Sequence, residues 1–251
     1  MSDEINASTN LHSEKFNAID ADIIFKSFDN VHFKIHRKNL ESCTGGFPPA
    51  GFETLGEILP LTESASTLEL LFQFIYPMPQ PNLRSCTFEI LAAVAEAAEK
   101  YQVYSAIYIC VLIMEMKLPE NAPMIFGHAG RHDHIYLLGK AAPYLIGKPL
   151  DEVASELPGH LIIPWIKYHM AWEKQLQKAR LYPERNVSWA LSDAVGYIFK
   201  FKEINDLKDL NAIFGDRNEN GNAFNRYLDA WRDNIESNIL GMKTFDKYLI
   251  L

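Results

Sequence analysis

The chain has 251 residues, and 48% of them are hydrophobic, which is enough apolar mass for a sizeable core in one or two domains. Its 24 Lys and Arg against 32 Asp and Glu give a net charge of −8, which argues against general nucleic-acid binding through basic stripes. Three cysteines without a C-x-x-C pair argue against a disulfide scaffold and a structural zinc site. The polar, acidic start and the lack of an apolar run of ~20 residues lead us to expect an intracellular protein of the cytoplasm or nucleus.

The first elements indicate a β-hairpin after a polar leader. Residues 1–20 are rich in Asn, Ser, Thr and Glu, and we expect them to form a flexible leader. The β-branched run 23–25 and the alternating run 31–35 flank an Asx-rich turn, which is typical of a hairpin. In this hairpin Val31, Phe33 and Ile35 should face one way, and His32 and Lys34 the other.

Helices dominate the next hundred residues. A short helix is expected at 37–43, where Thr44-Gly-Gly stops it, and a third strand at 57–61. Ser66 and Glu69 fit a capping box at the start of a helix whose apolar residues recur with helical spacing. Further helices are predicted at 88–101 and 104–116, and the latter is apolar almost all round, which favours burial.

This order of elements resembles a BTB/POZ domain. Residues 21–25 and 33–40 are similar to the family's opening, in which an aspartate begins a strand and a later strand leads into a His-basic pair and a short helix. Residues 68–76 resemble its helix that ends in an Ile-Tyr step. Residues 92–110, with Glu99-Lys-Tyr-Gln-Val, resemble its next pair of helices. The match covers about residues 20–117. The sequence Glu99-Lys-Tyr-Gln-Val, together with the helical half that follows, is similar to BTB proteins of the fungal branch in particular.

The resemblance implies an α+β fold, with a small β-sheet flanked by helices, that acts in protein–protein interaction, oligomerisation or scaffolding without catalysis. It also implies a charged, partner-binding pocket at Asp22 and Arg37, with His36 packed at the strand-to-helix corner. A half-buried Asp–Arg pair would need both partners, since a lone buried charge is costly. The same pair could instead serve only to tie the hairpin to the helix.

Two further roles follow from the resemblance. BTB proteins that bind Cullin-3 carry a hydrophobic-x-Glu motif, and Leu55-Gly-Glu57 has that form, so a substrate adaptor of a Cullin-3 ubiquitin ligase is an alternative. Others bind transcriptional corepressors. The polar leader departs from the family's N-terminal helix and strand, which argues against a strand-swapped dimer. Pro48-Pro49 stands where the family usually has a helix and should reshape that segment.

Charge divides the chain into two parts. Residues 1–120 hold 8 basic and 16 acidic residues and all three cysteines, whereas residues 121–251 hold 16 of each charge. We therefore expect a leader at 1–20, a BTB/POZ domain at 21–118 and an all-α helical extension at 119–251. A pair of short helices is predicted at 123–130 and 134–146, and three further helices at 161–180, 189–201 and 224–240 each carry an apolar stripe that should be buried. The partners of an acidic first domain should be basic or apolar proteins, or a second copy, rather than nucleic acid or membrane.

Two constellations in the second part could bind metal. His128, His132, Asp133 and His134 fall within seven residues and could ligate zinc, although their spacing fits no familiar signature. A helix end and the start of the next, with Asp133 as its cap, explains the same residues. Residues 216–221 copy the start of a calcium loop, but position 12 is Tyr227, which favours a plain turn.

Catalytic signatures are absent from the sequence. There is no G-x-S-x-G, Walker loop, G-x-G-x-x-G or H-E-x-x-H. The three cysteines, Cys43, Cys86 and Cys110, have no obvious base beside them and are expected to be packing thiols. We therefore expect a protein without enzymatic activity, cofactor or resident metal.

Overall fold

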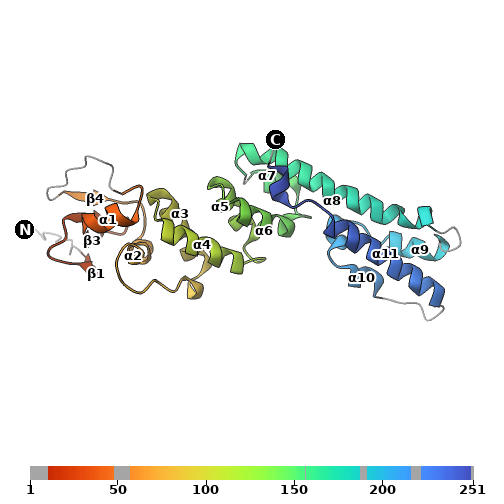
Figure 1. The fold of residues 1–251 in the computed structure, drawn as a ribbon, viewed down its shortest axis with the longest axis horizontal. Coiled ribbons are helices and arrows are strands. Elements are labelled where there is room, and N and C mark those ends of the chain that lie inside the picture. The colour runs from red at the N-terminus through yellow and green to blue at the C-terminus, as the bar shows by residue number, and fades with distance from the viewer. Residues whose placement is uncertain (1–10, 48–56, 156, 187–190, 216–221, 250–251) are drawn as a thin grey trace, which may run out of the picture. The chain divides into compact units, whose positions relative to one another are not determined.

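The computed structural model describes residues 11–47, 57–155, 157–186, 191–215 and 222–249 (Figure 1). The chain divides into two compact units, Met1–Leu118 and Pro119–Leu251. The fold is mixed α+β, and the four-stranded sheet belongs to the first unit. In the described part of the chain, no helix is both long and apolar enough to cross a membrane.

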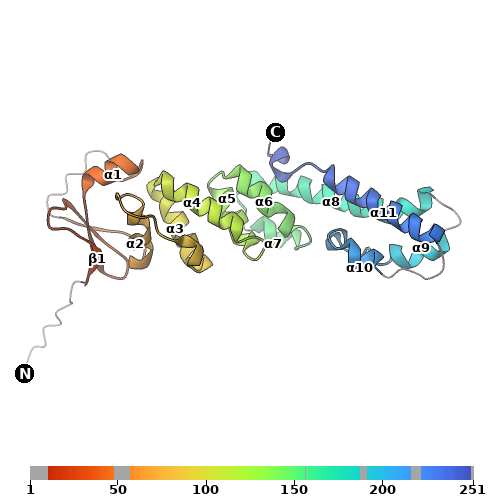
Figure 2. The ribbon, with the colours of Figure 1, turned by 60° about the horizontal axis from the view of Figure 1, so that its bottom comes forward.

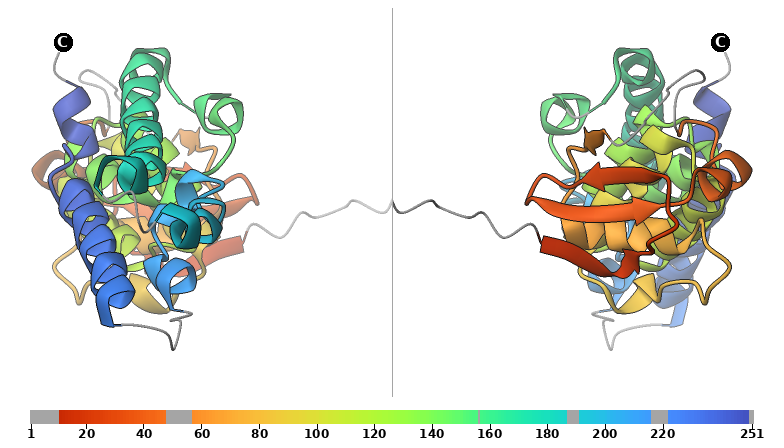
Figure 3. Two further views of the ribbon diagram at one scale, coloured as in Figure 1. Left: turned by 90° about the vertical axis from the view of Figure 1, so that its right-hand side faces the viewer. Right: turned by 90° about the vertical axis from the view of Figure 1, so that its left-hand side faces the viewer.

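The sheet has the strand order β1-β3-β2-β4, as Figure 3 shows edge to edge. Antiparallel pairing joins β2 (Ile23–Lys26) to β3 (Val31–Ile35) through a turn in which Asn30 is left-handed, with φ 66°. The other two strands, β1 (Leu11–Asn17) and β4 (Ile58–Pro60), pair in parallel with β3 and β2. The hairpin and the third strand predicted from the sequence are thus confirmed.

Strand β1 corrects the expectation of a flexible leader over residues 11–17. Its residues Ser13 and Phe16 are buried, and the Ser13 hydroxyl accepts a hydrogen bond from the Phe16 amide at 3.2 Å. This local bond accompanies a shift in the pairing register between His12 and Asn17. Such an irregularity breaks the strict alternation by which a strand is recognised in a sequence.

Strand β1 also extends the hairpin at its β3 edge. His32, which is expected on the opposite face from Val31, Phe33 and Ile35, is itself buried and only 5% exposed. Its ring lies edge-on to that of His12 on β1, with the ring centres 5.4 Å apart. Burial, then the neighbouring His12 and Lys26, lowers the pKa of His32.

The helices of the first unit follow the prediction closely. The ranges of α1 (Arg37–Cys43), α3 (Phe88–Tyr101) and α4 (Tyr104–Met116) match, and a 3₁₀ turn, η1, spans Leu83–Ser85. Helix α2 (Ala65–Gln73) begins earlier than expected, because Ser64 is its N-cap and accepts from the Thr67 amide at 3.3 Å. The prediction of a capping box formed by Ser66 and Glu69 is therefore wrong. An aromatic core joins α2 to the sheet, where the Phe72 ring lies 5.8 Å from Phe25 and 5.5 Å from Phe33.

Helices, and no strand, make up the regular structure of the second unit in its described residues, as expected (Figure 2). Its α-helices are α5 (Ala122–Arg131), α6 (Ile135–Leu145), α7 (Leu150–Ser155), α8 (Gly159–Asn186), α9 (Leu191–Ile198), α10 (Leu210–Phe214) and α11 (Asn222–Leu240), with 3₁₀ turns η2 (Ile204–Leu207) and η3 (Phe245–Tyr248). Helices α8 and α11 lie side by side, and Trp231 of α11 donates its indole N–H to the Ala179 carbonyl at 2.9 Å. Two aromatic clusters, around Trp165 and around Trp231, fill the interior.

Candidate functional site

Asp22 and Arg37 meet where β2 begins and α1 begins. The Asp22 carboxylate accepts a hydrogen bond of 2.6 Å from the backbone amide of Arg37. Arg37 is the first residue of α1, and the N-cap His36 has no side-chain cap bond of its own. Asp22 is exposed rather than half-buried, and it acts as the anion at the N-terminal end of α1. This contact favours the interpretation that Asp22 ties the hairpin to the helix.

His36 is held by two side chains at the same corner. The Tyr76 hydroxyl oxygen accepts from the His36 backbone amide at 3.0 Å and lies 2.9 Å from Nδ1 of its ring. On the other side of the ring, Nε2 lies 3.3 Å from the Asp20 carboxylate. His36 thus links Tyr76 to Asp20 across the corner. We call Asp20, Asp22, His36, Arg37 and Tyr76 the corner cluster.

The chemistry of the corner cluster is structural rather than nucleophilic. Burial raises the pKa of Tyr76, and so do the charges of Asp22 and Asp20. Hydrogen bonds from His36 and Asn39 act to lower the pKa but do not outweigh these effects. The phenol therefore stays protonated at neutral pH and keeps its hydrogen bonds. Sequence reasoning missed Asp20 and Tyr76 as members, although Tyr76 ends the Ile-Tyr step that carried part of the resemblance.

The hydrophobic-x-Glu motif is only partly visible. Leu55 lies outside the described residues, whereas Glu57 is exposed just before β4. The register pairs Ile58 with Ile24, so Glu57 stands level with Ile23 at the end of the sheet where Asp22 lies. Glu57 and Asp22 thus share one end of the sheet.

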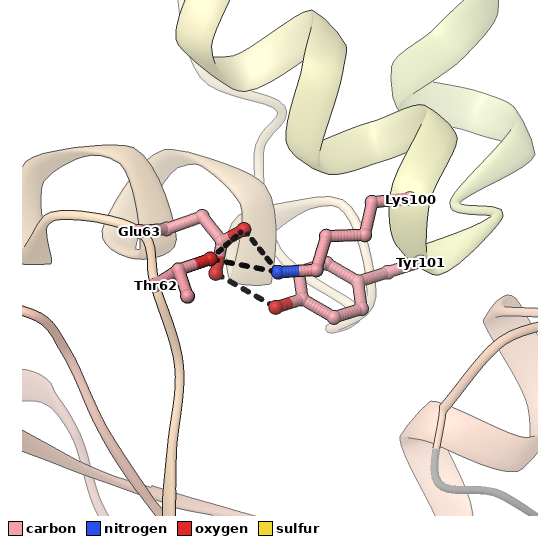
Figure 4. Close-up of polar contacts among 4 residues, drawn as sticks. All are labelled: Thr62, Glu63, Lys100 and Tyr101. Carbon is pink, nitrogen blue, oxygen red and sulfur yellow. Dashed lines mark hydrogen bonds and ion pairs between the residues drawn. The ribbon is translucent and has the colours of Figure 1, made fainter.

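A second polar cluster joins the start of α2 to the end of α3 (Figure 4). Lys100 donates from Nζ to Glu63 and to Thr62, both at 2.8 Å, and the Tyr101 hydroxyl donates to the other Glu63 oxygen at 2.7 Å. The Glu63 side chain is only 12% exposed. Burial would raise the pKa of Glu63, but the bonds from Lys100 and Tyr101 and the Lys100 charge outweigh it, so the pKa is lowered. We call these four residues the Glu63 cluster.

Sequence reasoning gave no hint of the Glu63 cluster. Lys100 and Tyr101 belong to the motif that carries the resemblance, but their partner Glu63 lies 37 and 38 residues earlier along the chain. A carboxylate with two charge-assisted or phenolic donors holds two elements together firmly. The cluster therefore fixes α2 against α3 and contains no group poised for catalysis.

Helix α4 exposes an apolar stripe, contrary to the expected burial. Tyr104, Tyr108, Leu112 and Met116 are spaced four residues apart and are 63%, 65%, 40% and 60% exposed. The opposite side packs inward through Ala106, Cys110, Ile113 and Met114. Because only one side of the helix is covered by its unit, an all-round apolar sequence does not mean a buried helix here. We call the four exposed residues the α4 stripe.

The histidine motif of the second unit does come together. The ring centres lie 4.7 Å apart for His128 and His132, 5.7 Å for His128 and His134, and 6.4 Å for His132 and His134. Asp133 is not a helix cap as expected, since the N-cap of α6 is His134 and Asp133 is left-handed, with φ 56°. The Asp133 carboxylate instead lies 3.7 Å from Nε2 of His160.

The remaining expectations divide between the described and the undescribed residues. The calcium-like stretch 216–221 lies outside the described residues. Cys110 is a buried thiol whose pKa is raised to about 12 by burial and by Glu99, as expected of a packing residue. Cys43 is exposed, so packing does not explain it.

Comparison with known proteins adds no family to this picture. A scan of protein-family models finds none that matches the chain, and a search of curated proteins finds no match either. The class that stands is a mixed α+β protein with a small four-stranded sheet and a helical second unit.

Proposed function

We propose that the first unit is a BTB/POZ-type interaction module through which the protein oligomerises or scaffolds partners, and that the second unit is its helical extension. The resemblance in residues 20–117 supports this proposal. So does the succession of the hairpin, α1, β4, α2, α3 and α4. The module acts by binding, without catalysis.

The α4 stripe is the observation that carries the proposal. Its four side chains together expose on the order of 400 Å² of largely apolar surface, the size at which a patch marks an interaction site. Tyrosine and methionine are enriched at protein interfaces. The only charged residue within α4 is Glu115, so the helix can meet a second copy without strong repulsion although residues 1–120 carry a net charge of −8.

The mass of the intact chain in solution tests this proposal. We expect light scattering to give at least twice the chain mass of 28.6 kDa. Tyr108→Glu combined with Leu112→Glu should shift the species toward the monomer, because a buried unpaired carboxylate is costly. Tyr144→Glu, at a 49% exposed tyrosine of α6, is the matched control and should leave the mass unchanged. A monomer in the wild type at all concentrations would overturn self-association.

Scaffolding of other proteins needs a separate comparison. Partners that co-purify with the wild type and with Tyr144→Glu, but not with the α4 double variant, would support scaffolding through the α4 stripe. The Cullin-3 adaptor rests on a motif of which Glu57 alone is described. That role predicts Cullin-3 binding that is lost in Glu57→Ala. The corepressor role rests on the resemblance alone.

A further inference from the structure

Three imidazoles lie close together at the junction of α5 and α6, and they come from one stretch of seven residues, 128–134. His128 lies in the last turn of α5, and His132 follows four residues later as its C-cap. Residues four apart on a helix are neighbours on one face. The His132 amide donates to the His128 carbonyl at 3.2 Å, so the helical geometry continues to His132.

The backbone then reverses and returns His134 to the same place. Asp133 adopts the left-handed conformation, and the His134 amide donates to the Ala129 carbonyl at 2.9 Å. This six-to-one bond after a left-handed residue is the closure of a Schellman-type helix end. The turn therefore has a fixed geometry and sets the third ring beside the first, with their planes 27° apart.

We propose that His128, His132 and His134 bind one zinc ion or a similar divalent transition metal. Zn–N distances of about 2.1 Å with tetrahedral angles place the centres of bound imidazole rings about 5 Å apart. The observed separations are 4.7, 5.7 and 6.4 Å. Ring nitrogens of His132 and of His134 each lie within 4.8 Å of a ring nitrogen of His128. No choice of one ring nitrogen from each histidine places all three within 4.8 Å of one another, so binding to one ion requires a rotamer change of His132 or His134.

The burial of the three residues supports a site with one fixed and two adjustable ligands. His128 is 3% exposed, whereas His132 and His134 are half-buried and can change rotamer. Imidazole suits zinc, copper, nickel and iron, and it binds calcium or magnesium poorly. Three protein ligands leave a fourth position for water or for a further ligand. This inference concerns the second unit alone and does not depend on the proposed function.

Titration of the intact, chelator-stripped chain with Zn²⁺ tests the site. We expect one ion per chain by calorimetry and a visible spectrum of tetrahedral Co²⁺ when cobalt replaces zinc. All four tryptophans of the sequence lie within residues 119–251, so their fluorescence follows the unfolding of the second unit. Bound zinc should raise its unfolding temperature by about 3 °C or more, because the ion binds only the folded chain.

Variants of the two adjustable ligands separate a built site from nonspecific binding. His132→Gln with His134→Gln should weaken Zn²⁺ binding by at least about tenfold and abolish the tetrahedral Co²⁺ spectrum. His169→Gln, at a half-buried histidine of α8, should bind as the wild type does. Circular dichroism checks that each variant folds. The proposal is overturned if the wild type binds no stoichiometric Zn²⁺, or if the double variant binds it equally well.

Discussion

The Asp22 carboxylate accepts a 2.6 Å hydrogen bond from the Arg37 amide, 15 residues later, and so fixes the start of α1 to the start of β2. We expect Asp22→Ala to lower the free energy of unfolding of the first unit by about 1 kcal/mol, as loss of a helix-capping acceptor does. Asp22→Asn should cost less, because an amide oxygen still accepts. Urea unfolding followed by circular dichroism measures both.

Two readouts sharpen the Asp22 test. Glu41→Ala, at an exposed position of α1 itself, should change stability by less than about 0.5 kcal/mol. Tryptophan fluorescence should be unchanged in each variant, since the four tryptophans lie in the second unit. An equal loss for Asp22→Ala and Glu41→Ala would contradict a specific role for the carboxylate.

Tyr76→Phe should destabilise the first unit although it keeps the aromatic ring. The variant removes the oxygen that accepts from the His36 amide and contacts the His36 ring. A part-buried amide left without its acceptor costs about 1–3 kcal/mol. Tyr144→Phe, at an exposed tyrosine of α6 outside the α4 stripe, should be nearly neutral. Urea unfolding of the two variants compares the costs, and similar values would refute the corner cluster as a structural lock.

The local elements could be predicted from the sequence because their signals are local. Thr87 accepts from the Ile90 amide at the start of α3, and Gln102 turns left-handed at its end, so both ends are marked within a few residues. Strand β1 could not be found, because the Ser13–Phe16 bond breaks its alternation. The sequence does not fix the start of α2, because Ser64 and Ser66 are equally suitable N-caps and only the structure shows that Ser64 is used.

The candidate sites were harder to predict, because their members are distant in sequence. His36 and Tyr76 are 40 residues apart, and Glu63 and Lys100 are 37 apart, with no spacing rule that joins them. The histidine motif was visible, but only the left-handed turn at Asp133 decides that its rings meet. Composition shows that α4 is apolar, but it does not show how much of the helix is covered by the rest of the first unit.

Stability at acid pH should depend on Glu63. Its pKa in the folded chain lies below the ordinary value of 4.5, because bonds from Lys100 and Tyr101 outweigh the effect of burial. Such a carboxyl stabilises the fold above its unfolded pKa, and the gain is lost as pH falls through its lower folded pKa. Glu63→Gln should therefore cost about 1–3 kcal/mol at pH 7 and progressively less below pH 4.5.

An exposed ion pair provides the control for Glu63. Lys15 and Glu69 are 3.0 Å apart, but their side chains are 53% and 37% exposed. Glu69→Gln should cost less than about 1 kcal/mol at either pH, as surface pairs usually do. Unfolding measured at several pH values separates the two carboxylates. A cost for Glu63→Gln that does not change with pH would exclude the lowered pKa as its cause.

In the second unit, two buried tryptophans differ in one hydrogen bond. Trp231 and Trp165 are both fully buried, but Trp231 donates its indole N–H to the Ala179 carbonyl. Among the described residues, the indole N–H of Trp165 has no hydrogen-bond partner. Both Trp→Phe changes leave a similar void, so we expect Trp231→Phe to cost about 1 kcal/mol more than Trp165→Phe. Urea unfolding followed by the fluorescence of the remaining tryptophans measures the difference, and a larger cost for Trp165→Phe would show that packing, not the bond to Ala179, sets the stability there.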